Sequence, residues 1–314
     1  MTSGLVQVSG RTRERPPAER PLAARRRRRS DLRLALIFIA PSAVGLIVFY
    51  LWPLARGIYV SFTNYNILQP PTWAGLGNYQ AMIHDQQFWN ALWVTVQYVL
   101  VNIGSQTVLA LGIAVLLDRL TRSLFIRVAV IFPWLVPNVA VGIISLFMLD
   151  KTVGILNHGL EAVGIPSQYF YQDPHQAIIT VALVNTWRNV GYTALLLFAG
   201  MQAIPRSLYE AAEVDGAGEW KKFIRITLPL LRPVLALVMT VSVIGSFQIF
   251  DTVSVVYQQP IPQATVLYYY IYEAAFAQGR MGYASAMAVV LLIITSVLTV
   301  IQLRLLRSSQ TDLA

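Results

Sequence analysis

The sequence predicts an all-α integral membrane protein with six transmembrane helices, on the evidence of its composition and its long apolar segments. The chain has 314 residues, 56% of them hydrophobic and 12% charged, with a mean hydropathy of +0.56. Soluble domains are typically about 45–50% apolar and about 25% charged. A chain with half that charge cannot cover its surface with solvated groups, so its composition does not fit a soluble enzyme, a disordered protein or a disulfide-rich secreted domain.

Six apolar segments are each long enough to cross a bilayer, which takes about 20 apolar residues. None has the alternating pattern of a barrel strand, so each is predicted to be a helix, which satisfies its own backbone hydrogen bonds. The predicted spans are residues 34–62, 91–117, 128–149, 177–203, 230–256 and 284–306.

The distribution of Lys and Arg predicts the orientation of these spans. If the N-terminus is cytoplasmic, 20 of the 24 basic residues fall on the cytoplasmic side, 10 of them before residue 34. Cytoplasmic loops carry such an excess, so both termini are predicted to face the cytoplasm. The net charge of +9 is therefore a topology signal, and no nucleic-acid partner is predicted because no DNA or RNA motif accompanies it.

Two domains are expected. Residues 1–30 are rich in Arg, Pro and Ala and are predicted to form a disordered, basic cytoplasmic tail in contact with membrane lipid. Residues 31–314 are predicted to form the six-helix transmembrane domain.

No catalytic residue and no metal site is predicted. The chain has no cysteine, and its three histidines, His84, His158 and His175, lack the spacing of metal ligands. No nucleophile–base pair or carboxylate pair lies in the spans, and no G-x-x-x-x-G-K-[ST] phosphate loop occurs. The chain is therefore not expected to hydrolyse ATP.

The loop between the fourth and fifth spans, residues 205–229, carries the most informative pattern. Residues 208–214 are predicted to form a short helix that Gly216 and Gly218 end, and residues 220–228 a second one. The second helix would carry an apolar face, because aromatic and aliphatic residues recur in it at i, i+3 and i+4. Such a pair predicts a protruding knob; a plain interfacial helix is the alternative.

This loop resembles the signature of ABC importer permeases, which is Glu-Ala-Ala, three residues, Gly, nine residues and Ile-x-Leu-Pro. The residues that fill it are Glu210, Ala211, Ala212, Gly216, Ile226, Leu228 and Pro229. Further segments resemble the sugar-importer branch of that family. They are Asp215-Gly216-Ala217 with Phe223, Gly75-Leu76-Gly77-Asn78-Tyr79 with Phe88-Trp89, and Gly282-Tyr283-Ala284-Ser285-Ala286. Only the N-terminal tail lies outside the resemblance.

The resemblance implies a type I ABC importer permease fold in which the 205–229 loop is the coupling helix that docks on a cytoplasmic ATPase. The residues implied to couple are Glu210, Ala211, Ala212, Asp215, Gly216, Trp220, Phe223, Ile226, Leu228 and Pro229. ATP and Mg²⁺ would bind that ATPase, and this chain would hold no cofactor. The implied partners are a second six-helix permease subunit, two ATPase subunits or a homodimer of one, and an external solute-binding lipoprotein. The resemblance also implies that the spans lie in the cytoplasmic (inner) membrane of a bacterium.

Polar side chains in two of the spans indicate a path for the substrate. An Arg at mid-helix costs about 2.5–3.5 kcal/mol on insertion scales, so the polar face of the fourth span should point into the bundle. That face, at i, i+3, i+4 and i+7, consists of Asn185, Arg188, Asn189 and Tyr192. The fifth span offers, at the same spacing and in an adjacent stripe, Ser242, Gly245, Ser246, Ile249, Gln248 and Asp251.

In the maltose member of the family these two helices contact the sugar, so the resemblance implies the same here. That member has Leu and Gly in place of Arg188 and Asn189, which disfavours maltose and favours a more polar or an anionic ligand. The alternative is structural, with Arg188 simply paired to Asp251. Elsewhere, Asn102 and Gln106 are predicted to hold helices together, and Asn138 to lie at a kink beside two prolines.

The predicted function is therefore the permease subunit of an ATP-driven importer for a carbohydrate, contributing half of the translocation path. A permease for glycerol phosphate or another polar solute is the alternative. A proton-coupled secondary transporter is a third reading, for which Asp251 is the candidate buried carboxylate.

Overall fold

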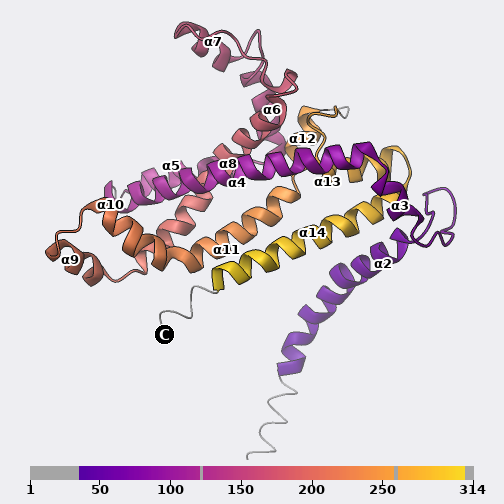
Figure 1. Ribbon diagram of the computed structural model, residues 1–314, viewed down its shortest axis with the longest axis horizontal. Coiled ribbons are helices and arrows are strands. Elements are labelled where there is room, and N and C mark those ends of the chain that lie inside the picture. The colour runs from indigo at the N-terminus through magenta and orange to yellow at the C-terminus, as the bar shows by residue number, and fades with distance from the viewer. Residues whose placement is uncertain (1–34, 121–122, 258–260, 308–314) are drawn as a thin grey trace, which may run out of the picture. The chain divides into compact units, whose positions relative to one another are not determined.

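The computed structural model describes residues 35–120, 123–257 and 261–307, and helices are the only regular elements within them (Figure 1). The predicted tail, residues 1–30, lies outside the described residues. The chain divides into two units, residues 1–56 and 57–314, which are considered separately.

The first predicted span is confirmed as a helix. It runs from Ala35 to Ser61 and is long and apolar enough to cross a membrane. Its second half consists of one π-helical stretch, η1 (Ile47–Leu51), followed by α2 (Trp52–Ser61).

Two further spans in the second unit are long single helices, α4 (Gln86–Leu120) and α14 (Met281–Arg307). The fifth span is α11 (Leu228–Phe247), continued after a short break by α12 (Asp251–Val256). In this unit α4, α8 (Ala177–Gln202), α11 and α14 pack against one another as a bundle (Figure 1).

The third predicted span is a helix pair rather than one helix. It consists of α5 (Leu124–Leu135) and α6 (Asn138–Met148), whose axes bend by 91°. Pro137 stands at the bend, and a proline has no N–H to donate and disfavours helical backbone in the residue before it. The bend therefore has a local cause, and it leaves carbonyl groups at the end of α5 in need of donors.

The fourth predicted span is confirmed as a helix, α8, but not as an apolar membrane-crossing segment. Four helices of the described residues are long and apolar enough to cross a membrane, or five if α5 and α6 count as one span, and α8 is outside that set. Its polarity has a structural reason, because 13 of its 26 residues are buried against other helices. The half of a helix that packs against protein does not need the apolar surface that lipid demands.

Short helices connect these elements. They are α3 (Gly77–Ile83), α7 (Ile155–Ala162), η2 (Phe170–Gln172), α9 (Arg206–Val214), α10 (Glu219–Lys222), η3 (Phe223–Thr227), α13 (Leu267–Tyr272) and η4 (Glu273–Ala277).

Two apolar clusters form the core of the second unit. The larger one joins the N-terminal halves of α4, α8 and α14 with α13. The smaller one joins the C-terminal halves of α4 and α8 with the first half of α11. Because the clusters occupy opposite ends of α4 and α8, the middle of these helices lies between two packed cores.

Candidate functional site

The 205–229 loop forms two short helices around a tight turn, as predicted. No residue of α9 is buried, and Gly216 has a φ of +72°, in the left-handed region that glycine adopts without strain. After the turn, α10 passes through the π-helical η3 into α11. Figure 1 shows α9 and α10 together at one end of the bundle.

The predicted residues of this loop divide into an exposed set and a partly buried set. Glu210, Ala211, Asp215, Gly216 and Trp220 are exposed, while Ala212, Phe223, Ile226, Leu228 and Pro229 are half-buried at its base. The Trp220 side chain is 74% exposed and its ring stacks on Phe223 at 5.9 Å. An exposed tryptophan whose ring is held in place by a neighbouring aromatic ring can serve as an anchor for another protein.

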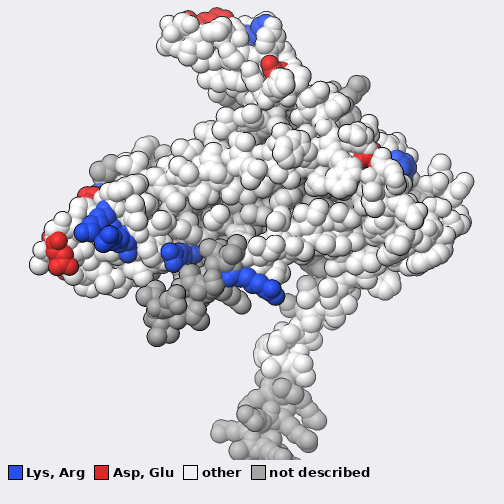
Figure 2. Space-filling view, viewed as in Figure 1, with Lys and Arg blue, Asp and Glu red and all other residues white. Residues whose placement is uncertain are grey.

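Ion pairs join the two short helices of the loop to each other and to the end of α4. Sequence analysis did not predict them. Lys222 is buried, and its Nζ lies 2.6 Å from Glu213 Oε1 and also contacts Glu219. Glu219 in turn pairs with Arg119 at the end of α4. Only the spacing of Glu219 and Lys222, i and i+3, was visible in the sequence. Figure 2 shows charged side chains gathered over α9 and α10 on a face that is otherwise mostly uncharged.

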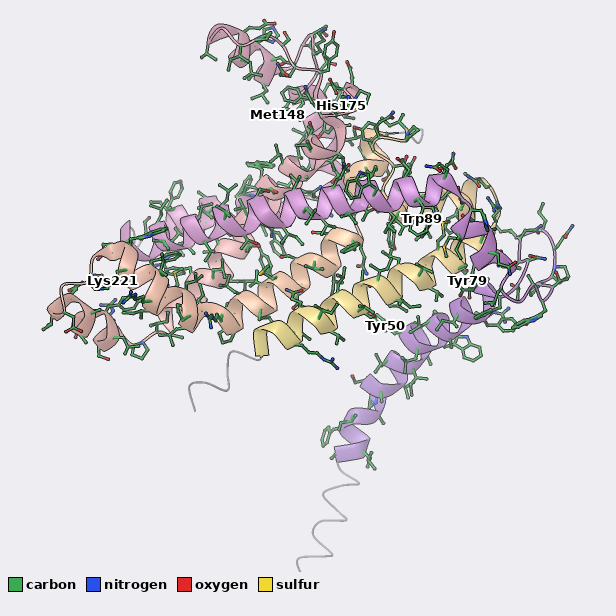
Figure 3. The ribbon with its side chains drawn as sticks, in the orientation of Figure 1. Tyr50, Tyr79, Trp89, Met148, His175 and Lys221 are labelled. Carbon is green, nitrogen blue, oxygen red and sulfur yellow. The ribbon has the colours of Figure 1, made fainter. Side chains whose placement is uncertain are left out.

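A cavity of about 540 Å³ lies in the middle of the bundle, between the two apolar clusters. Its walls come from α4, α5, α6, α8, α11 and the residues that follow α11. All ten residues of the predicted path line it, namely Asn185, Arg188, Asn189, Tyr192, Ser242, Gly245, Ser246, Gln248, Ile249 and Asp251. Side chains from α4 and α11 reach into the space between the helices (Figure 3).

Arg188 is bonded to the bend between α5 and α6. Its Nε donates to the carbonyl of Val136 (2.9 Å) and its Nη2 to that of Trp134 (3.1 Å), which the bend leaves without helical partners. Its Nη1 donates to Asn189 Oδ1 (3.1 Å). A guanidinium has five N–H groups, so these three bonds leave two N–H groups for a ligand.

The Arg188–Asp251 ion pair is not formed. Both residues line the cavity, but no ion pair within 4.0 Å joins these two described side chains. Asp251 instead accepts a hydrogen bond from Asn138 Nδ2 (2.8 Å), which links the start of α6 to the start of α12. Asn138 thus does lie at the kink, and it ties two interrupted helices together.

Asn102 and Gln106 hold helices together, which confirms their prediction. Asn102 donates to Thr186 on α8 (3.1 Å) and accepts from Ser246 on α11 (3.0 Å). Gln106 donates to Thr193 on α8 (2.7 Å). One polar stretch of α4 therefore contacts both of the helices that carry the predicted path.

Two contacts between α5 and α8, one of them in the cavity wall, were missed by sequence analysis. Trp134 stacks on Tyr192 at 4.6 Å with nearly parallel rings, although its segment had been read only as an apolar span. Gly191 lets α8 approach α5 closely, since a Cβ there would stand 1.8 Å from the carbonyl oxygen of Val130. Neither contact had a local signal, because each joins residues far apart in the sequence.

A smaller polar cluster lies at the N-terminal end of α4. Asp85 accepts hydrogen bonds from Tyr270 (2.7 Å) and Tyr283. Burial raises the pKa of this carboxyl, but the bonds from Tyr283, Tyr270 and the amides of Gln87 and Phe88 outweigh burial, and the pKa lies below its usual value.

Comparisons of the sequence with family models and with known proteins all point to the same family. The family model described as "Binding-protein-dependent transport system inner membrane component" matches residues 106–310. The sulfoquinovosyl glycerol transport system permease protein SmoG of Agrobacterium fabrum is 33% identical, over 88% of this chain and 92% of SmoG. The sn-glycerol-3-phosphate transport system permease protein UgpA of Salmonella typhimurium is 30% identical, over 88% of this chain and 94% of UgpA.

A solved structure shares the fold. It is a chain of a bacterial ABC transporter involved in the import of the acidic polysaccharide alginate, with a TM-score of 0.78. The match covers 91% of this chain and 98% of that chain at 22% identity, so the likeness concerns the fold alone.

Proposed function

The chain belongs to the family of binding-protein-dependent transport system inner membrane components and so is the permease subunit of an ABC importer rather than an enzyme, and we propose that its substrate is a carbohydrate. ATP is hydrolysed by a separate subunit of such importers. The family assignment also removes the proton-coupled secondary transporter from the candidate functions.

Six helices are proposed to cross the bacterial inner membrane, with both termini and the 205–229 loop in the cytoplasm. The support is a helix at five of the six predicted positions, the bent pair α5 and α6 at the other, and the distribution of Lys and Arg in the sequence. In this proposal α8 crosses as the central helix and is sheltered from lipid by its neighbours. Residues 31–314 would form one permease domain, and residues 1–30 a basic tail.

The 205–229 loop is proposed to dock in a groove of the ATPase. Glu210 and Asp215 are exposed and could meet basic groups there, and Trp220 would insert as the anchor. ATP and Mg²⁺ would be held by the ATPase pair, and closure of that pair would rock the helices as rigid bodies. A second six-helix permease subunit and an external solute-binding protein would complete the importer.

The substrate proposal rests on one observation, that residues predicted from two separate helices line a single cavity. The stacked Trp134 and Tyr192 offer a flat apolar surface to a sugar ring, while Arg188 and Asp251 offer donors and acceptors to hydroxyl groups. The breaks between α5 and α6 and between α11 and α12 lie beside this cavity, and the substrate sites of many transporters are formed by interrupted helices of this kind. Binding there would have to be weak, since the substrate must leave.

The names of the relatives support a polar or anionic solute. One relative is named for sulfoquinovosyl glycerol, another for sn-glycerol-3-phosphate, and the structural neighbour takes part in alginate import. The two N–H groups left on Arg188 suit a carboxylate, a sulfonate or a phosphate as well as a pair of hydroxyls. A glycerol-phosphate permease therefore stays as the second candidate.

Transport by the reconstituted complex tests the proposal. The importer is placed in vesicles with ATP, and uptake of a panel of neutral and acidic sugars and of glycerol phosphate is measured, with ligands first ranked by thermal stabilisation of the binding protein. Gly245→Trp would fill the cavity from a position that has open space around it, so uptake should stop while assembly persists. Uptake at the normal rate by that variant would refute the path.

A double variant tests the loop. Glu210→Lys with Gly216→Pro removes the exposed acid and the left-handed turn, since proline fixes φ near −65°. The chain should still insert, but ATP hydrolysis and uptake should be uncoupled. Normal ATP-driven uptake would refute the assignment of the loop.

A further inference from the structure

The 205–229 loop is joined covalently to only two helices of the bundle. Its N-terminal side follows α8, and its C-terminal side enters α11 through η3, a π-helical stretch. π-helical turns interrupt the regular hydrogen-bond ladder and are frequent at functional sites. A displacement of the loop would therefore reach α11 through an irregular joint.

A second connection runs through side chains to a third helix, α4. Four residues form a continuous ion-pair network, in the order Glu213, Lys222, Glu219 and Arg119. The first three lie on both sides of the Gly216 turn, so the network braces α9 against α10. The fourth, Arg119, lies in the last turn of α4.

The network is built unevenly, with a buried centre and exposed ends. Lys222 is 5% exposed and takes one carboxylate from each side of the turn. Loss of both carboxylates would leave the Lys222 ammonium unpaired and destabilise the loop, whereas loss of Glu219 alone leaves the pair with Glu213 in place. Arg119 and Glu219 are partly exposed, and pairs of this kind contribute little to folding. The link to α4 can therefore be cut without unfolding the chain.

The helix at the far end of this network is the one that bonds both walls of the cavity. Asn102 of α4 contacts Thr186 on α8 and Ser246 on α11, and Gln106 contacts Thr193 on α8. Next to Arg119, Asp118 accepts a bond from Gln202 at the end of α8 (2.5 Å). A movement of the end of α4 would thus be carried to α8 and α11 at the level of the cavity.

We propose that the ion-pair network of Glu213, Lys222, Glu219 and Arg119 transmits the movement of the 205–229 loop to α4, so that α4, α8 and α11 move as one body around the cavity. The inference rests on the proposed docking of the loop on an ATPase. Arg119 is a positioning residue in this scheme, because it acts on the cavity through α4.

The test is the ratio of solute taken up to ATP hydrolysed in the reconstituted importer. Arg119→Gln should lower this ratio about fivefold or more, the lower end of ordinary couplings between sites, with normal assembly and continuing ATP hydrolysis. Arg119→Lys, which keeps the charge, should recover part of the ratio. Arg232→Gln is the matched control, because Arg232 is an exposed arginine on α11 outside the loop, and it should leave the ratio unchanged.

An unchanged ratio in Arg119→Gln overturns the network. The outcome is distinguishable from failure of the proposed function. If Glu210→Lys with Gly216→Pro uncouples the importer and Arg119→Gln does not, only the network is wrong. If neither variant has an effect, the loop itself has been misassigned.

A crosslink provides a second, independent measurement. The chain has no cysteine, so Arg119→Cys with Glu219→Cys creates a unique thiol pair. Uptake should fall in the double variant and recover when a short bismaleimide replaces the ion pair with a covalent link. Loss of residual uptake on crosslinking would overturn the proposal, since it would mean that the contact must open during transport. Failure of the two thiols to crosslink at all would also overturn it.

Discussion

The cavity and the 205–229 loop use polar side chains in opposite ways. In the cavity, Arg188, Asn102 and Asn138 bond to carbonyls, hydroxyls and a carboxylate of other helices, and the helices approach closely. In the loop, charged side chains pair with one another while Trp220 faces outward. Changes that break these contacts between helices should therefore cost folding, whereas changes on the exposed face of the loop should cost contact with a partner.

The largest loss of stability is expected at Gly191. In Gly191→Val the new side chain would begin 1.8 Å from the carbonyl oxygen of Val130, so α5 and α8 would be forced apart. Overpacking of this kind costs about 3 kcal/mol or more, and little folded protein should be recovered. Yield and thermal unfolding in detergent measure this. Gly245→Ala, on the same cavity with open space around it, is the control and should unfold like the parent chain.

An intermediate loss is expected at Arg188. Arg188→Met leaves the carbonyls of Trp134 and Val136 without donors, which should cost about 1–3 kcal/mol and also weaken uptake. Asp251→Asn should cost less, because the amide oxygen can still accept from Asn138. Thermal unfolding of the two variants measures separately the contacts of Arg188 with the carbonyls and the contact of Asp251 with Asn138. Equal losses would indicate that the two residues act as an ion pair after all.

The N-terminal end of α4 differs from both regions, because there the charge of Asp85 is held by neutral donors. The pKa of Asp85 is lowered in the folded chain, so its contribution to stability is present above the unfolded pKa and is lost as the pH falls through the folded pKa. Asp85→Asn should therefore unfold at a lower temperature than the parent chain near pH 7, and the difference should shrink below about pH 4. A difference that does not change with pH would contradict this assignment.

The smallest effect on stability is expected at Trp220. Because the side chain is 74% exposed, Trp220→Ala should change the free energy of unfolding by about 0.5 kcal/mol or less. Retention of the ATPase during purification should nevertheless fall. Trp73→Ala is the control, since Trp73 is 69% exposed and lies between the first two predicted spans, outside the 205–229 loop. Equal loss of the ATPase in both variants would show that Trp220 is not a specific anchor.

Much of the fold could be predicted because its signals are local. Helices leave a continuous apolar or one-sided polar pattern along the chain, and the face of Asn185, Arg188 and Tyr192 follows directly from helical spacing. The turn at Gly216 was predictable for the same reason. Whether α8 crosses the membrane is harder to judge, because half of its residues are buried against other helices and need not be apolar.

By itself, the sequence determined the helices, the charge distribution that orients them and the pattern of the 205–229 loop, since each depends on residues close together along the chain. Only the tertiary structure decided which partners the charged groups take. Arg188 meets the carbonyls of Trp134 and Val136 instead of Asp251, and Arg119 meets Glu219 across 100 positions of sequence. The physical reason is that burying an unpaired charge costs free energy, so a charged group pairs with whichever donors or acceptors the packing of the helices brings within reach. That packing leaves no local pattern in the sequence.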